Sequence, residues 1–178
     1  MPQASLDPGA KLRIVHIFRA PLGGLFRHVV DLAREQTARG HLVGMFFDCG
    51  VKGPAIERAL ERVGDLSLGV TTRAIPRNPS HRDLAGIAAC AAFLSRVGAD
   101  VAHGHGSKGG LYARAPGLLN PGAGPLRAYT PHGGSFNYAP GSGLHRIYMG
   151  VERILTRATD VLLFESGYIA TRFDAFVG

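Results

Sequence analysis

The sequence contains no tryptophan and only two cysteines in 178 residues, Cys49 and Cys90. These thiols lie far apart and lack metal-ligand spacing, which argues against a disulfide scaffold and a cysteine zinc site. No apolar run reaches the roughly 18–20 residues that span a bilayer, and no charged-then-apolar leader opens the chain. We therefore expect a cytoplasmic protein with a disordered N-terminal tail at residues 1–10.

Several familiar motifs are also missing. The dinucleotide fingerprint G-x-G-x-x-G and the phosphate loop G-x-x-x-x-G-K-[ST] do not occur, which disfavours NAD and ordinary ATP-loop proteins. Ser166 has no G-x-S-x-G elbow around it, which argues against a nucleophilic hydrolase. No basic cluster interleaves with aromatic residues, so nucleic acid is a disfavoured partner.

Positive charge is in excess, with a formal net charge of +7 and a pI of about 10.0. The excess favours anionic partners such as nucleotide phosphates or an acidic lipid surface. The arginines are scattered singly, however, and scattered arginine is more often a solvated face than a binding stripe. The net charge alone therefore does not decide whether the protein binds an anionic partner.

The composition is otherwise that of a globular domain, with 46% hydrophobic residues against an average of about 45–50%. Apolar strand-like runs alternate with segments of helical periodicity. We expect strands at residues 11–18, 41–47, 66–70, 100–103, 127–130 and 161–164 and helices starting near residues 22, 54, 80, 110, 144 and 168. This alternation predicts an α/β fold, a parallel sheet with helices on both faces.

Local patterns add details to this outline. Gly40 is expected to end the first helix, and Ser80-x-x-Asp83 resembles a capping box at the start of another. Leu84 is expected to face inward on that helix. Glu152 is more typical of a surface ion pair than of a catalytic acid.

In parallel α/β sheets, ligands bind beyond the carboxyl ends of the strands. The segments that follow the expected strands are 19–24, 48–52, 104–110, 131–138 and 165–167. They are also the richest parts of the sequence in glycine, histidine and serine. This coincidence predicts a ligand site along one edge of the sheet.

Two glycine-rich segments are candidates within that edge. Gly23-Gly24 follows a strand and opens a helix, so it is either a phosphate-binding turn or a tight bend. In "HGHGSKGG", His103 and His105 alternate and so share one side of a strand, but no nearby Cys, Asp or Glu completes a zinc site, and we predict no metal. Lys108 is expected to be exposed in the cleft, where it contacts an anion or is merely solvated.

The stretch "YTPHGGSFNY" carries the most information. His132 follows Pro131 at a strand end, and the glycines after it leave space beside the ring. Such an imidazole can bond a hydroxyl or phosphate oxygen, or exchange a proton near neutral pH. The alternative is a hydrogen-bonded packing residue.

The order of these motifs resembles a known family. The segments "GGLFRHVVDLAREQTARGHLV", "DVAHGHGSKGGLYAR", "YTPHGGSFNY" and "VERILTRATDVLLFES" together resemble the N-terminal domain of family 4 glycosyltransferases, especially bacterial polysaccharide-assembly members, over residues 12–178. The resemblance implies one half of a GT-B fold, in which two Rossmann-like domains face each other across a cleft. It further implies sugar transfer from a nucleotide-sugar donor with retention of configuration, usually without a required metal or other cofactor.

The resemblance also implies roles for individual residues. Gly23 and Gly24 would contact the donor diphosphate through backbone N–H groups, and His132 would be the catalytic-site residue contacting the transferred sugar or the acceptor. The residues implied on the acceptor side are Ser107, Lys108, Gly133 and Ser166.

Partners follow from the same resemblance. The acceptor would be a saccharide or a lipid-linked molecule at the inner membrane face. Arginines of the first helix could then contact anionic lipid, at about 1 kcal/mol per basic residue; they are Arg27, Arg34 and Arg39.

One departure from the family concerns the second domain, which holds most of the donor nucleotide. The sequence stops at "RFDAFVG", where the interdomain linker would begin, so we expect the C-terminal donor-binding domain to be absent and this chain alone to lack turnover. Two alternatives stay open: a non-catalytic binding or regulatory module derived from such a domain, and half of a nucleotide-sugar epimerase.

Overall fold

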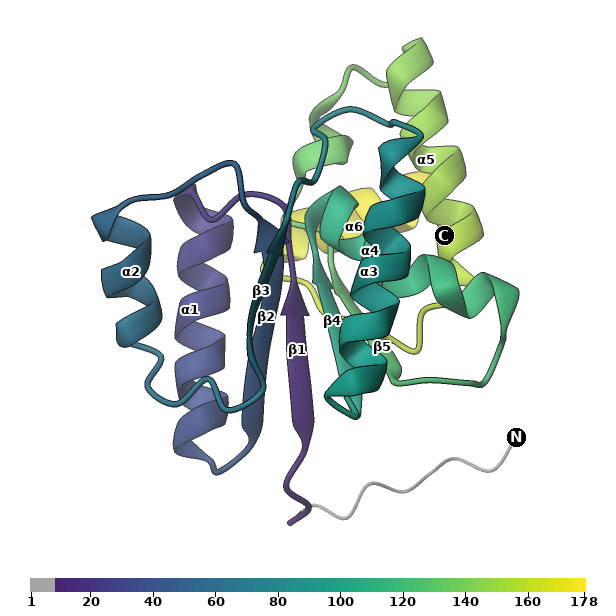
Figure 1. The fold of residues 1–178 in the computed structure, drawn as a ribbon. Coiled ribbons are helices and arrows are strands. Elements are labelled where there is room, and N and C mark those ends of the chain that lie inside the picture. Colours follow the sequence, from purple (N-terminus) through teal and green to yellow (C-terminus); the bar gives the residue numbers. More distant parts are fainter. Residues whose placement is uncertain (1–8) are drawn as a thin grey trace.

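The computed structural model describes residues 9–178. The disordered tail expected at residues 1–10 therefore lies outside the described residues, apart from its last two positions. The described chain forms one six-stranded parallel sheet in the order β3-β2-β1-β4-β5-β6 (Figure 1). Its strands are β1 (Arg13–Ile17), β2 (Leu42–Asp48), β3 (Gly69–Arg73), β4 (Val101–His105), β5 (Leu126–Thr130) and β6 (Val161–Leu162).

Helices connect the strands and cover both faces of the sheet, as Figure 1 shows. They are α1 (Gly23–Ala38), α2 (Pro54–Glu61), α3 (Arg82–Arg96), α4 (Gly106–Leu119), α5 (Gly143–Thr156) and α6 (Gly167–Phe176), with a 3-10 turn, η1, at Gly134–Asn137. Helices α1 and α2 share one apolar cluster with β2, while α3 and α4 share another with β1 and β2. The predicted α/β architecture, a Rossmann-like parallel sheet covered on both faces, is confirmed.

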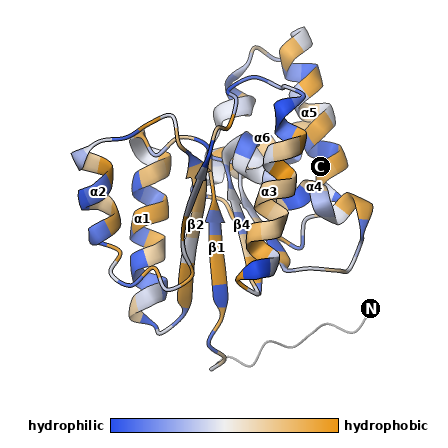
Figure 2. Cartoon of the chain, in the orientation of Figure 1, coloured by the Kyte–Doolittle hydropathy of each residue, from blue (hydrophilic) through white to orange (hydrophobic). Residues whose placement is uncertain are grey.

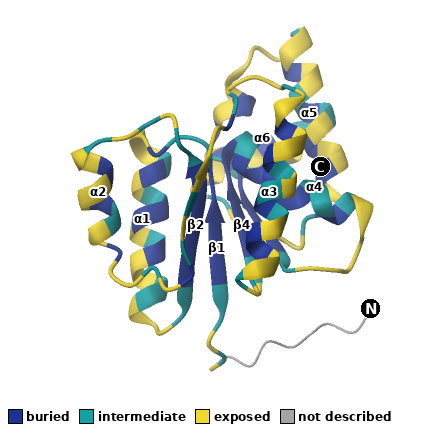
Figure 3. Cartoon of the chain, in the orientation of Figure 1, coloured by how far each residue is buried: buried dark blue, intermediate teal, exposed yellow. Residues whose placement is uncertain are grey.

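The central strands are buried on both sides, which explains their nearly continuous apolar sequences. In β1, Val15 and Ile17 pack toward α3 and α4, whereas Val43 and Met45 of β2 pack toward α1 and α2. Hydrophobic residues follow the sheet and the inner sides of the helices (Figure 2), and the same positions are the buried ones (Figure 3). A third cluster, around Tyr129, joins β5 to α5 and α6.

Helix α4 approaches the sheet very closely because its first turns are rich in glycine. A Cβ atom on Gly109 would overlap the carbonyl oxygen of Ile17 in β1. A Cβ atom on Gly104 of β4 would lie 2.7 Å from the Gly109 carbonyl oxygen. The glycines of "HGHGSKGG" thus have a packing role, which brings the N-terminus of α4 to the carboxyl edge of the sheet.

The structure corrects several local expectations. Strand β3 occupies Gly69–Arg73 rather than residues 66–70, and α4 begins at Gly106 rather than near residue 110. Leu84 is 73% exposed, so its predicted inward orientation is wrong. The inward face of α3 instead contains Asp83, because this carboxylate is bonded by Lys108 and Tyr112 of α4.

The hydrogen bonds and backbone at two helix ends agree with the predicted caps. The carboxylate of Asp83 accepts a hydrogen bond from the backbone N–H of Ser80, and the Ser80 hydroxyl accepts one from the N–H of Arg82. Gly40 follows α1 with a φ of 86°, the left-handed conformation typical of a helix end. Glu152, expected at the surface, is instead buried against Arg114, so that expectation is wrong.

Candidate functional site

A cavity of about 420 Å³ opens at the carboxyl edge of the sheet, between the loops that follow β1, β4 and β5. This size lies within the range of roughly 300–1,000 Å³ typical of small-molecule sites. Its lining includes Arg19, Leu22, Leu25, Arg77, His105, Gly106, Ser107, Lys108, His132, Ser135, Tyr138 and Tyr148. The cavity therefore lies where the strand-end segments were expected to converge.

His132 adopts an unusual backbone conformation at the cavity wall. Its φ is 52°, and it is the one non-glycine residue with a positive φ within residues 9–178. Gly133 continues the turn with a φ of 70°. Such conformations cost free energy for residues with a Cβ atom and are concentrated at functional sites. The turn after Pro131 thus fixes the position of this imidazole.

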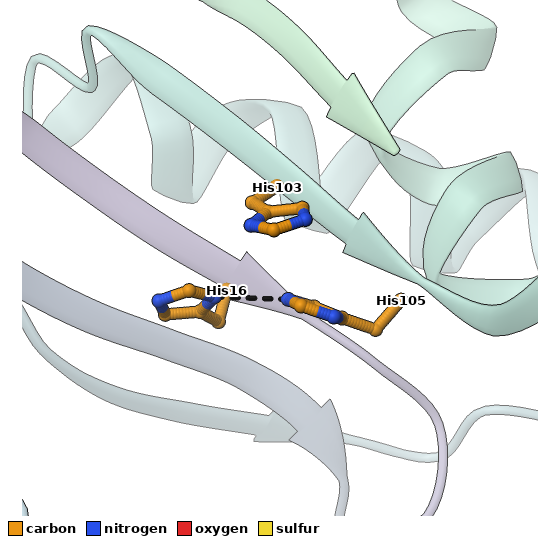
Figure 4. A group of neighbouring side chains, drawn as sticks. All are labelled: His16, His103 and His105. Atoms are coloured by element: carbon orange, nitrogen blue, oxygen red, sulfur yellow. Dashed lines mark hydrogen bonds between the residues drawn. The ribbon is translucent and has the colours of Figure 1, made fainter. Parts of the chain in front are cut away.

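The ring of His132 belongs to a chain of closely spaced polar side chains that continues into the sheet, in which hydrogen bonds link the histidines. Its Nδ1 atom lies 2.5 Å from Glu165 Oε2, and its Nε2 atom lies 3.1 Å from His105 Nδ1. The Nε2 atom of His105 then lies 2.9 Å from His16 Nδ1, the bond drawn in Figure 4. The chain ends at Gln36 of α1, whose Oε1 atom lies 2.8 Å from His16 Nε2.

Strand register explains why these histidines meet. His16 of β1 is the direct partner of His103 of β4, and His105 follows two residues later on the same face (Figure 4). His103 bonds Thr130 of β5 through its Nε2 atom, at 2.9 Å from Oγ1. The expectation that His103 and His105 share one side of a strand is confirmed.

Burial keeps these imidazoles uncharged. Removal from water lowers the pKa of His16 and of His132 to about 4, with a smaller contribution from His28 in both cases. The pKa values of His103 and His105 are also lowered, mainly by burial and then by neighbouring histidines. Burial raises the pKa of Glu165. At neutral pH the histidines are therefore neutral hydrogen-bonding groups.

Two groups of three histidines within residues 9–178 have the spacing of possible metal ligands: His16, His103 and His105, and His28, His105 and His132. Both ring nitrogens of His16 and His105 already have hydrogen-bond partners, and so does Nε2 of His132, whose Nδ1 atom faces Glu165. A metal would have to displace these bonds, so we interpret the cluster as a hydrogen-bond network. The sequence indicated only His103 and His105, because His16 and His28 reach them through tertiary contacts.

Lys108 lines the cavity, but its ammonium group is not free. It lies 2.6 Å from Asp83 Oδ2, and its side chain is only 10% exposed. It also donates to the carbonyl oxygen of Asn78, while the Tyr112 hydroxyl donates to the same Asp83 carboxylate. The expected exposure of Lys108 is therefore wrong, because α3 supplies a buried partner that the sequence did not indicate.

The other predicted residues fall at the same edge but not all within the cavity. Ser107 and His132 line it, whereas Gly23 and Gly24 open α1 beside it, between the lining residues Leu22 and Leu25. Two further predicted residues lie outside the lining: Gly133 packs against Ile169, and Ser166 caps α6 by accepting a bond from the N–H of Ile169.

Sequence reasoning missed one polar group of the site, Arg77, and did not assign the environment of two others, Ser135 and Glu165. Arg77 enters the lining from the loop between β3 and α3, which none of the predicted strand-end segments includes. Ser135 is 3% exposed, and its hydroxyl has no hydrogen-bond partner within residues 9–178. Glu165 follows the last strand, where the sequence allowed it to face the cleft, but its contact with His132 depends on the order of β5 and β6.

The strand order, the helices on both faces and the cavity at the carboxyl edge define a Rossmann-like domain, the class that matches halves of GT-B glycosyltransferases. The chain belongs to glycosyltransferase family 4, whose sequence model matches residues 22–178. Within the described residues, no helix is long and apolar enough to cross a membrane.

A solved structure agrees on the fold. The chain is similar to sucrose-phosphate synthase from Thermosynechococcus elongatus, with a TM-score of 0.61 and 15% identity, over 94% of this chain and 46% of that one. A looser likeness is to a glycotransferase of kitacinnamycin, with a TM-score of 0.46 and 15% identity, over 93% and 39% of the two chains. This chain thus spans less than half the length of these structures. The comparison with curated proteins gives no match.

Proposed function

We propose that this chain is the acceptor-side half of a family 4 glycosyltransferase of the bacterial polysaccharide-assembly type. The complete enzyme would transfer a sugar, with retention, from a nucleotide-sugar donor to a saccharide or lipid-linked acceptor. The observation that carries this proposal is the cavity at the carboxyl edge, with His132 held in its wall on a left-handed backbone.

The start of α1 supports a place for the donor diphosphate. Apart from the adjoining residues and the backbone of α1 itself, no atom of residues 9–178 lies within 4 Å of a Cβ atom built on Gly23 or Gly24, so a ligand has room to approach the backbone there. No side chain caps the helix, and its first-turn N–H groups are available. The positive end of the helix dipole favours the negative charge that develops on a departing nucleoside diphosphate.

His132 is proposed to contact the transferred sugar or the acceptor, although both of its ring nitrogens have protein partners. His105 is completely buried, whereas the side chain of Glu165 is 30% exposed. A substrate hydroxyl would therefore replace Glu165 at Nδ1 more readily than His105 at Nε2. In this arrangement the buried histidines hold the ring while its outer nitrogen exchanges partners.

Reconstitution tests the proposal. The 178-residue chain alone is expected to give no turnover, because the donor-binding half of the site lies in another domain of the family. Mixing it with a separately expressed donor-binding domain should restore transfer of a radiolabelled sugar. Binding of the two domains to each other without sugar transfer would favour the regulatory-module alternative. Sugar transfer by the isolated chain at a normal rate would contradict the proposal that the donor-binding domain is required.

Two histidine variants of the reconstituted mixture test whether His132 itself contributes to sugar transfer. His132→Ala should lower kcat in the mixture by about 10²–10⁴-fold, the usual range for loss of a positioned acid–base or hydrogen-bonding group. His81→Ala removes an exposed histidine at the start of α3 and should leave kcat unchanged. Equal effects of the two substitutions would exclude a specific role of His132.

A further inference from the structure

The cavity described above has an excess of positive charge that the proposed contacts do not use. Arg19, Arg77 and Lys108 are in its lining, and among residues 9–178 no Asp or Glu belongs to the lining. Only Lys108 has an acidic partner among these three, since the ion pairs found within residues 9–178 leave out both arginines. Two carboxylates contact lining residues without being in the lining themselves: Asp83 pairs with Lys108, and Glu165 contacts His132.

The N-terminus of α4 adds a second source of positive potential. Gly106, Ser107 and Lys108, the first three residues of this 14-residue helix, all line the cavity. The residue at the cap position is His105, whose side chain makes no capping bond because its ring is held by His16 and His132. The positive end of the helix dipole therefore faces the cavity without a protein side chain to satisfy it.

An unpartnered hydroxyl points independently to a ligand at the same place. Ser135 lines the cavity and is 3% exposed, and its buried Oγ atom has no hydrogen-bond partner in the described part of the chain. A buried hydroxyl without a partner is costly, and native structures rarely keep one unless a ligand or water satisfies it. The arginines and the end of α4 supply positive charge to the cavity, and Ser135 supplies a hydrogen-bonding group.

We infer that this cavity binds a phosphate group of the substrate, held by Arg19, Arg77, the hydroxyl of Ser135 and the N-terminus of α4. Arginine matches phosphate oxygens in geometry as well as charge, and helix N-termini bind such anions repeatedly. Since the Gly23-Gly24 turn lies outside the lining, the phosphate is assigned to the acceptor rather than the donor. That last assignment rests on the proposed function; the anion site itself does not.

Binding to the 178-residue chain tests the site directly. Calorimetry and amide NMR would compare glucose 6-phosphate, neutral glucose and uridine diphosphate. We expect glucose 6-phosphate to bind and to shift the amide resonances of Gly106, Ser107 and Lys108, whereas glucose does neither. Arg77→Ala and Ser135→Ala should each weaken glucose 6-phosphate binding by about 5- to 50-fold, as expected for loss of one charge-assisted or buried hydrogen bond.

The control is Arg82→Ala, which removes an exposed arginine outside the cavity lining and should leave the dissociation constant within about twofold. Equal weakening by Arg77→Ala and Arg82→Ala would show only general charge attraction and overturn the site. The acceptor assignment would be overturned if Arg77→Ala weakened the binding of uridine diphosphate but not the binding of glucose 6-phosphate. Arg77-dependent phosphate binding combined with no transfer in the reconstituted mixture would refute the proposed function while leaving the anion site in place.

Discussion

The guanidinium group of Arg114 lies 2.7 Å from the carboxylate of Glu152, and both side chains are almost completely buried. Arg114 also lies over the ring of Tyr129, 3.5 Å from its centroid, and the Tyr129 hydroxyl donates to the second Glu152 oxygen. This group ties α4 to β5 and α5. It therefore links the helix whose N-terminus enters the cavity to the strand that precedes His132.

We predict that Glu152→Ala destabilises the protein by about 3–5 kcal/mol, because it leaves the Arg114 charge buried without its partner. Urea unfolding would measure the change. The control is Glu35→Ala, which removes the exposed partner of Arg39 and should change stability by less than about 1 kcal/mol. Similar losses from the two substitutions would contradict the assignment of the buried pair as structurally essential.

Two helix glycines should respond oppositely to alanine. Gly109→Ala would force a Cβ atom against the Ile17 backbone, and we expect a loss of about 1–3 kcal/mol or more from overpacking. Gly150 lies inside α5 with nothing within 4 Å of a built Cβ atom, so Gly150→Ala should stabilise by about 0.5–1 kcal/mol. Thermal and urea unfolding would test both, and tolerance of Gly109→Ala would disprove the close approach of α4.

Stability should fall as the pH decreases from about 7 toward 4. The unfolded chain protonates its histidines near their ordinary pKa of about 6.5, whereas folded His16 and His132 resist protonation until about pH 4. Between these values the unfolded state binds more protons, and each such histidine costs up to about 1.4 kcal/mol per pH unit. The raised pKa of Glu165 acts in the opposite direction.

Unfolding in urea at pH 7.5 and 5.5 would measure this dependence. His16→Gln should reduce the difference in unfolding free energy between the two pH values, while His81→Ala, at an exposed position, should preserve it. An unfolding free energy that stays constant over this range would show that the histidine network accepts protons in the folded state.

The two cysteines should differ sharply in reactivity. Cys90 is buried in α3, and burial raises its pKa to about 12, so its thiol should not react with a disulfide reagent in the folded protein. Cys49 is partly exposed after β2 and should react first. Titration with a chromogenic disulfide should thus give one thiol when native and two when unfolded; rapid reaction of both native thiols would contradict the packing of α3.

Membrane contact through α1 stays a prediction. Arg27 and Arg39 are exposed and form i,i+4 pairs with Asp31 and Glu35, pairs weak enough to exchange for lipid phosphates. Replacing Arg27, Arg34 and Arg39 together by alanine should reduce flotation with anionic liposomes. Flotation that does not depend on anionic lipid content would remove the hypothesis.

The sequence by itself determined the alternation of strands and helices, and therefore the parallel sheet, because hydrophobic periodicity is a local property of the chain. It also indicated the carboxyl edge as the site, since glycine, histidine and serine gather after the strands. Boundaries shifted where tertiary contacts prevail over local pattern: β3 moved toward Arg73, and α4 began four residues early because its glycines pack against β1 and β4.

Only the tertiary structure decided which side chains meet. His16, His105, His132 and Glu165 come from four separate segments, and parallel register together with strand order brings them into one chain of contacting side chains. The same is true of Asp83, which neutralises Lys108 from another helix. Burial and pairing depend on distances between segments remote in sequence, and a local pattern carries no information about those distances.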